Sequence, residues 1–151
     1  MEFRKWQRKD FNQMIDLGEK MYKEGAYKNL SYNKNKLLIM AEKLIDKPKT
    51  SMGFVAEENN EIIGMMIVIL RNYFFSDDLF CHDLLLFIDP YKRKSIKVPI
   101  RLINMASEWA KENGAKEFRP ASSVGIEKEK VAKLYNFMKF DNVGYVFRKE
   151  L

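Results

Sequence analysis

The sequence contains few of the residues on which several classes of active site depend. Cys81 is the only cysteine, so the chain cannot form an internal disulfide, as suits a reducing compartment. His82 is the only histidine, which excludes every metal site that takes two or more histidine ligands from this chain. A catalytic pair of Cys81 and His82 is disfavoured, because neighbouring residues on a strand point to opposite faces.

Long apolar segments are also missing. The longest apolar run, Ile62–Leu70, has nine residues, about half of what a membrane-spanning helix needs. The first residues lead into a polar stretch and do not resemble the apolar segment of a signal peptide. We therefore expect a cytoplasmic protein that does not associate with membranes.

The overall composition is that of a globular domain. Hydrophobic residues make up 46% and charged residues 32% of the 151 positions, with only seven glycines and four prolines, which argues against a disordered chain or a repeat array. The length predicts one domain that spans residues 1–151. The net charge of +6 leaves three anionic partners open: nucleic acid, acidic lipid and a phosphorylated cofactor.

Hydrophobic periodicity predicts six strands and four helices. The strands are expected at Glu2–Gln7, Ser51–Glu57, Glu61–Arg71, Leu79–Ile88, Glu117–Arg119 and Gly144–Lys149. The helices are expected to follow Asp10 and then to span Tyr32–Ile45, Ile96–Asn113 and Glu127–Met138. This order predicts an α/β fold in which one mixed sheet packs against helices. Because Leu84–Ile88 is apolar without alternation, that strand is expected to be buried on both faces.

The densest group of positive charges lies between the fourth strand and the third helix. Lys92, Arg93, Lys94, Lys97 and Arg101 follow one another there with no acidic residue among them. The N-terminus of a helix already presents free backbone N–H groups and a partial positive charge. A diphosphate could bind there, although a solvated basic loop is the plainer alternative.

Two polar residues stand out against apolar surroundings. Tyr135 lies on the inner face of the last helix, where a tyrosine most often serves packing and hydrogen-bonds its hydroxyl. Asp83 interrupts an apolar strand, where burying a carboxylate is costly unless it has a partner. The plainer alternative is that Asp83 lies at the end of the strand and stays in contact with water. Strand parity groups Asp83 with Cys81, Leu85 and Phe87, and His82 with Leu84 and Leu86.

Two segments resemble the GNAT superfamily of acyl-CoA N-acyltransferases. Residues 83–98, DLLLFIDPYKRKSIKV, resemble the central motif of that superfamily, in which a strand leads through a proline into a phosphate-binding loop. Residues 131–140, VAKLYNFMKF, resemble its later segment around a tyrosine. The order of elements is also similar along nearly the whole chain. The resemblance implies a mostly antiparallel, mixed sheet of about six strands flanked by four helices.

The resemblance also implies roles for particular residues. It implies that pantetheine contacts the backbone of Leu86, Phe87 and Ile88, and that a backbone N–H near Phe87 polarises the thioester. It implies a pyrophosphate on the amides of the loop, here Arg93, Lys94, Ser95, Ile96, Lys97 and Val98. Tyr135 matches the general acid of the superfamily. Asp83 is the nearest match to its base, and Cys81 and His82 have no role in this assignment.

The function expected from the resemblance is acetyl transfer from acetyl-CoA to an amine in a ternary complex, without a metal. Ile96, Val98 and Lys139 stand where the superfamily carries small residues, and Lys128 stands where it often carries asparagine. A catalytically silent acyl-CoA-binding module is therefore one alternative, and a nucleic-acid-binding or -modifying protein is another. The acceptor and the oligomeric state, a homodimer included, stay open.

Overall fold

The computed structural model describes all 151 residues and contains one five-stranded sheet. Its strands are β1 (Glu2–Lys5), β2 (Ser51–Glu58), β3 (Glu61–Asn72), β4 (Leu79–Ile88) and β5 (Ala115–Arg119), which lie side by side in chain order. β1 to β4 pair antiparallel, and β5 pairs parallel to β4. The mixed, mostly antiparallel sheet expected from the sequence is confirmed.

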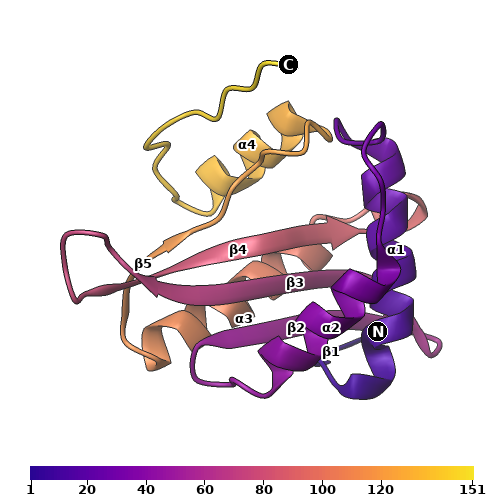
Figure 1. Cartoon of the computed structure of the whole chain (residues 1–151), viewed down its shortest axis with the longest axis horizontal. Helices are drawn as coiled ribbons and strands as arrows, with labels where there is room; N and C mark the ends of the chain where they lie inside the picture. The colour runs from indigo at the N-terminus through magenta and orange to yellow at the C-terminus, as the bar shows by residue number, and fades with distance from the viewer.

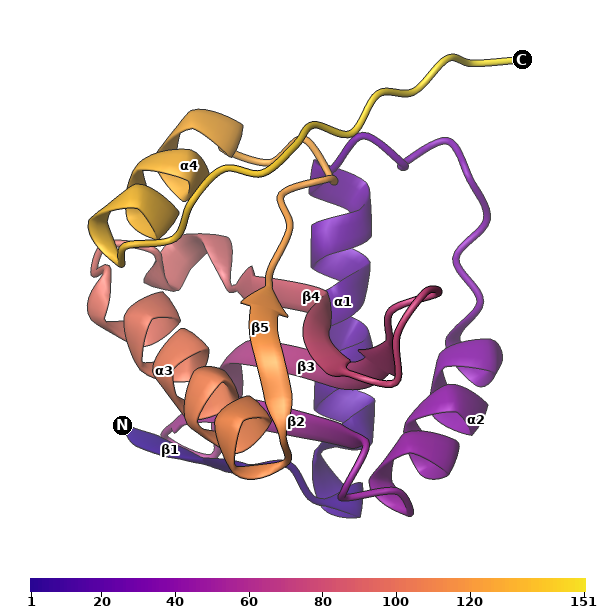
Figure 2. The same cartoon turned by 90° about the vertical axis from the view of Figure 1, so that its left-hand side faces the viewer.

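Helices cover both faces of this sheet. α1 (Phe11–Glu24) and α2 (Lys34–Ile45) lie on one face, and α3 (Lys97–Glu112) lies on the other (Figures 1 and 2). α4 (Lys128–Phe137) lies near α3, beyond the end of β5 (Figure 2). Two short 3-10 turns, η1 (Arg8–Asp10) and η2 (Pro90–Lys92), lead into α1 and toward α3. None of the helices is both long enough and apolar enough to cross a bilayer.

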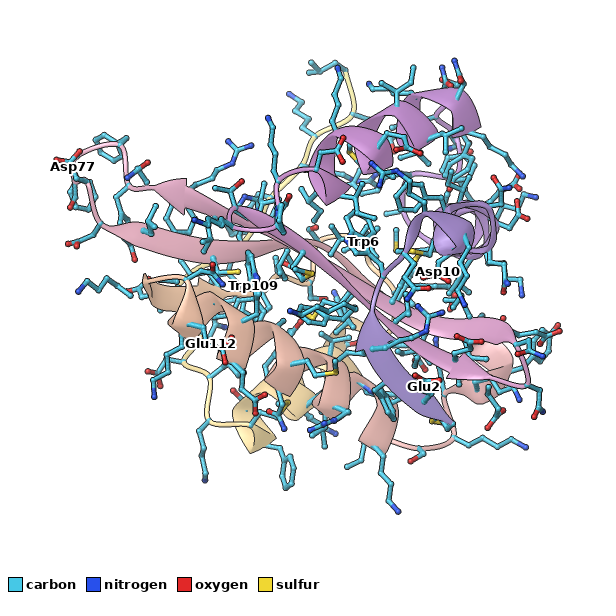
Figure 3. The ribbon with its side chains drawn as sticks, turned by 90° about the horizontal axis from the view of Figure 1, so that it is seen from below. Glu2, Trp6, Asp10, Asp77, Trp109 and Glu112 are labelled. Atoms are coloured by element: carbon cyan, nitrogen blue, oxygen red, sulfur yellow. The ribbon has the colours of Figure 1, made fainter.

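Apolar side chains fill the space between the sheet and the helices on both faces. On one side Trp109 of α3 is 4% exposed, and on the other Trp6 is 6% exposed between the sheet and α1 and α2 (Figure 3). The Trp6 ring lies directly over Gly53 of β2, where an added Cβ would come within 2.3 Å of the ring. Only glycine leaves room for the indole there. This packing fixes the entrance to α1 against the sheet.

The sixth strand, expected at Gly144–Lys149, is absent, so that prediction is wrong. Residues 139–151 follow α4 without regular structure, and Val143, Tyr145, Val146 and Phe147 are 71–89% exposed. The segment pairs with neither the free edge of β4 nor the outer edge of β5, and β propensity alone does not bring it to either. The tail instead runs toward α1, where Arg148 Nη1 donates to the carbonyl of Ala26 at 2.9 Å.

β4 is less buried than its apolar sequence indicates. Phe87 and Ile88 are buried, but Leu84 is 40% exposed and Leu85 and Leu86 are partly exposed. The expectation that this segment is buried on both faces is therefore wrong. The physical reason is that β5 pairs only with the first part of β4, Leu79–His82, so the remainder has a neighbouring strand on the β3 side alone.

Candidate active site

A β-bulge in β4 determines which way the candidate residues point. Ile67 of β3 pairs with Leu85 and Val68 pairs with Asp83, so Leu84 has no partner in β3. The extra residue reverses the parity of the strand, because cross-strand partners share a face. Asp83 therefore faces the α3 side and Leu85 faces the α1 and α2 side. The prediction that Asp83 and Leu85 lie on the same face is therefore wrong. A continuous apolar run contains no sequence pattern that would indicate the position of a bulge.

The second half of β4 presents an unpaired edge. The amide of Asp89 donates to the Ile63 carbonyl at 2.8 Å, which fixes the alternation of the ladder with β3. Phe87 consequently directs its N–H and C=O toward β3, whereas Leu86 and Ile88 direct theirs toward the free edge. The donors available to a ligand are thus the amides on either side of Phe87.

A cavity of about 130 Å³ lies beside this edge. It is enclosed by β4, by the loop that follows β5, and by the first turns of α3 and the inner face of α4. Four of the predicted cofactor residues line it, together with the predicted general acid: Leu86, Phe87, Ile88, Arg93 and Tyr135. Segments that are far apart in the sequence thus meet at one place, as the resemblance implies.

The Tyr135 hydroxyl is the one buried side-chain polar atom of the molecule without a hydrogen-bond partner. Its ring packs edge-on against Phe140, with 5.4 Å between ring centroids. Burial, and secondarily the nearby Asp83 carboxylate, raises the pKa of the Tyr135 phenol, so the group stays protonated at neutral pH. An unpartnered buried hydroxyl costs about 1–3 kcal/mol, and a catalytic role is one of the reasons for which proteins retain such a group.

Asp83 lies close to the same cavity. Its Oδ1 accepts a hydrogen bond of 2.9 Å from the amide of Ala121, a residue that lines the cavity. Burial raises the pKa of this carboxyl to about 6, and its bonds to backbone N–H groups oppose the rise. A carboxylate with that pKa is mostly ionised at neutral pH and is a stronger base than an exposed aspartate.

The turn before α3 has unusually many free backbone donors. The amides of Arg93, Lys94, Ser95, Ile96 and Val98 donate no hydrogen bond, and that of Lys97 donates only to Ser95 Oγ at 3.2 Å. No side chain caps α3. Amides without a partner at a helix N-terminus are the kind of group that binds anions in proteins.

Arg93 is engaged by the protein itself. Its guanidinium donates to both oxygens of Glu24 at the end of α1, at 2.5 and 2.8 Å, and its Nε donates to the Ile88 carbonyl at 2.9 Å. It also lies over the Phe87 ring, 4.8 Å from the centroid. Sequence reasoning missed Glu24, which is 69 residues away and belongs to no local pattern. Lys94, Lys97 and Arg101 form no ion pair and keep their charges available.

The two residues next to Asp83 do not join it. Cys81 is fully buried, and burial raises the pKa of its thiol to about 12, so no thiolate forms at neutral pH. His82 pairs with Ile69 on the opposite face, and its Nδ1 lies 3.1 Å from the carbonyl of Asp83. No three histidine, cysteine or acidic side chains are placed to hold a metal ion.

The sequence matches no protein-family model and no curated protein, whereas the structure has close counterparts among solved structures. The aminoglycoside N-acetyltransferase AAC(6')-Iy, solved with a CoA-linked bisubstrate analogue, gives a TM-score of 0.78 at 17% identity over 99% of this chain and 98% of that one. A transcriptional regulator from Bacillus halodurans C-125 gives 0.77 at 19% identity over 99% of each chain. Glucosamine-6-phosphate N-acetyltransferase from Arabidopsis thaliana gives 0.76 at 16% identity over 99% of this chain and 97% of that one.

At these identities the likeness concerns the fold. The chain has the GNAT fold that its sequence resembles, with five strands in the sheet where about six were expected.

Proposed function

We propose that this protein is an acetyl-CoA-dependent N-acetyltransferase. The observation that carries the proposal is the buried, unpartnered hydroxyl of Tyr135, a residue that lines the same cavity as the free edge of β4. A thioester substrate needs a proton donor for its sulfur and hydrogen-bond donors for its carbonyl oxygen and pantetheine arm. The Tyr135 hydroxyl would supply the first, and the unpaired edge of β4 would supply the second. N-acetyltransferases with the same fold over the same length add support.

The cofactor would be held mainly by backbone groups. The free amides between Arg93 and Val98 bind the diphosphate, with Lys94 and Lys97 adding positive charge. The Leu86 N–H and C=O and the Ile88 N–H pair with the amides of the pantetheine arm, as a short additional strand would, whereas the Ile88 carbonyl already accepts from Arg93. Arg93 acts by holding the turn to α1 through Glu24. Leu86, Ile88 and the loop amides therefore do the binding, and Arg93 keeps them in position.

Transfer then needs one proton to be removed and one to be supplied. Asp83, directly or through a water, accepts a proton from the attacking amine, whose nitrogen forms a bond to the thioester carbonyl carbon. A β4 amide next to Phe87 stabilises the negative charge that develops on the carbonyl oxygen. The carbon–sulfur bond breaks, and Tyr135 donates its proton to the departing thiolate. The products are an N-acetyl amine and CoA as the free thiol.

Direct transfer is favoured over a covalent acyl-cysteine. The only thiol of the chain belongs to Cys81, which is fully buried on the α3 side of β4 with its pKa raised to about 12. A thiol in that state is a poor nucleophile. The amine of the acceptor is therefore the group that attacks.

Ligand-induced stabilisation tests cofactor binding. CoA at about 100 times its Kd is expected to stabilise the fold by roughly 2.7 kcal/mol, which raises the melting temperature of a chain of this size by roughly 5–10 °C. Lys97→Glu is expected to reduce that shift, because it places a negative charge at the first turn of α3 beside the diphosphate.

A charge reversal on the other side of the molecule is the matched control. Lys43→Glu on α2 makes the same change of net charge on the opposite face of the sheet, and the shift with CoA is expected to persist. No shift with millimolar CoA in the unmodified chain would contradict the proposal. An equal loss of the CoA-induced melting shift in Lys97→Glu and Lys43→Glu would mean that net charge, and not the turn before α3, determines binding.

A further inference from the structure

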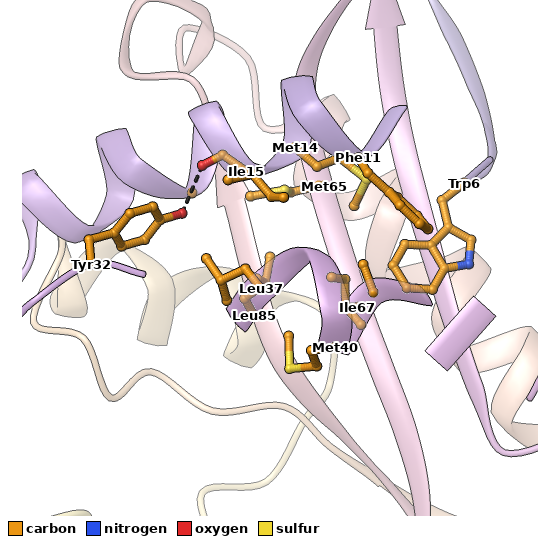
Figure 4. A pocket seen from close by; sticks show the side chains of 12 residues that line it. Trp6, Phe11, Met14, Ile15, Tyr32, Leu37, Met40, Met65, Ile67 and Leu85 are labelled. Carbon is orange, nitrogen blue, oxygen red and sulfur yellow. Dashed lines mark hydrogen bonds between the residues drawn. The ribbon is translucent and has the colours of Figure 1, made fainter. Parts of the chain in front are cut away.

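A second cavity lies on the other side of β4 from the first. Its volume is about 50 Å³, and it is enclosed by α1, α2 and the α1-facing side of the sheet (Figure 4). Leu85 lines this cavity, and Leu86 lines the larger one. Leu85 and Leu86 are consecutive in the regular part of β4, so the two cavities lie on opposite faces of the strand, beside its unpaired edge.

The lining of the second cavity is almost entirely apolar. Eleven of its twelve lining residues are hydrophobic, and none carries a charge. The Tyr32 hydroxyl donates to the Ile15 carbonyl at 2.7 Å and is not available to a ligand. The indole nitrogen of Trp6 is turned away from the other lining side chains (Figure 4). A polar group placed here would lose its bonds to water and gain none, so the cavity selects apolar groups.

The cavity can be reached from the surface. Its floor consists of buried residues such as Phe11, Met14 and Met65, which are 1–5% exposed. Its rim consists of partly exposed side chains: Ile15, Tyr32, Leu37, Met40 and Leu85. A volume of about 50 Å³ has room for a small branched aliphatic group and not for a sugar ring.

We infer that this cavity binds a compact apolar group carried by the acceptor amine, close to the nitrogen that is acetylated. The inference rests on the proposed function and names the class of its acceptor. Successive residues of a strand are about 3.3 Å apart along the chain and point to opposite faces, so a group held against Leu85 lies across β4 from Leu86, beside the unpaired edge where transfer would occur. Short aliphatic amines therefore fit the site better than polyhydroxylated ones.

A matched pair of amines measures this preference. Valinamide and threoninamide have the same shape and the same amine, but one methyl group of the first is a hydroxyl in the second. We expect kcat/KM for valinamide to exceed that for threoninamide by about 10- to 100-fold, and that for glycinamide by at least about tenfold. Calorimetric titration of the CoA-loaded protein with the same amides reports the preference without requiring turnover.

Filling the cavity should remove the preference. Ala41→Val adds two carbons at a lining position of α2 that is 8% exposed, and Ile39→Val on the same helix changes a side chain that is 48% exposed and outside the lining. We expect Ala41→Val to lower kcat/KM for valinamide at least about tenfold, with the CoA-induced melting shift unchanged, and Ile39→Val to have no effect. Leu37→Phe at the rim serves as the second filling variant if Ala41→Val fails to fold.

The outcomes separate this inference from the proposed function. Acetylation of all three amides at equal kcat/KM would overturn the inference and leave the proposed function standing. Preferential binding of valinamide that both filling variants abolish, without any acetylation, would support the inference and count against catalysis. Unchanged preference in folded Ala41→Val and Leu37→Phe would also overturn the inference.

Discussion

Replacing Tyr135 with phenylalanine is expected to lower the turnover number by about 10²–10⁴ and to leave the affinity for CoA nearly unchanged. The substitution keeps the ring and its contact with Phe140 and removes only the hydroxyl. Because that hydroxyl is buried without a partner, its removal should also raise the free energy of unfolding, by about 1 kcal/mol or more. Steady-state kinetics and chemical denaturation of the two proteins measure both effects.

A second tyrosine provides the control. The hydroxyl of Tyr22 donates to the Lys28 carbonyl at 2.9 Å on the surface, so Tyr22→Phe removes a hydroxyl that has a partner. This variant is expected to lose a little stability and no turnover. A more stable Tyr135→Phe protein with full turnover would assign Tyr135 to packing alone.

Asp83→Asn is expected to lower kcat/KM most strongly near neutral pH, by about 10²–10⁴. In the unmodified protein kcat/KM should rise as Asp83 ionises, with an apparent pKa of about 6, and the variant should lack this rise. Activity should recover at high pH, where the amine loses its proton unaided. A pH–rate profile from pH 5 to 10 records the difference.

The direction in which the stability of the protein changes with pH also follows from the environment of Asp83. Burial raises the pKa of Asp83 in the folded state from 3.8 to about 6, so folding favours the protonated carboxyl. The stability that this group contributes is fully present below about pH 4 and is lost as the pH rises through about 6. Asp83→Asn should remove that decline, which denaturation at pH 4 and pH 7 measures.

His82→Ala is the control for the base. The His82 ring lies on the face of β4 opposite to Asp83, and its removal should change the rate little. An unchanged pH–rate profile in Asp83→Asn, together with a severe loss of rate in His82→Ala, would identify His82 and not Asp83 as the base.

The sequence predicts most elements of the fold because each carries its own local pattern. The helices follow from their apolar stripes, and β4 ends before Asp89-Pro90 as its sequence indicates. The missing strand at Gly144–Lys149 had the right local pattern but does not lie along either free edge of the sheet. Whether a segment reaches an edge depends on the path of the chain, which a local pattern does not encode.

The candidate site was predictable only in part. The basic turn and Tyr135 stand out in the sequence, and Arg93 of that turn lines one cavity with Tyr135, whereas Lys94–Val98 do not. The bulge at Leu84 and the Glu24–Arg93 pair depend on contacts between distant segments, so no local pattern points to them. The apolar cavity depends on how three elements pack against one another, which composition does not determine.

Amine-dependent release of free CoA thiol from acetyl-CoA measures the proposed acetyl transfer itself. We expect a thiol signal that requires both an amine and the protein, with one thiol released per amine acetylated, and that falls by about 10²–10⁴ in Tyr135→Phe. The acetylated amine should appear in equal amount by mass spectrometry. A protein that binds CoA and releases no thiol above the rate in buffer with any amine offered, valinamide included, would contradict the claim and identify a silent acyl-CoA-binding module.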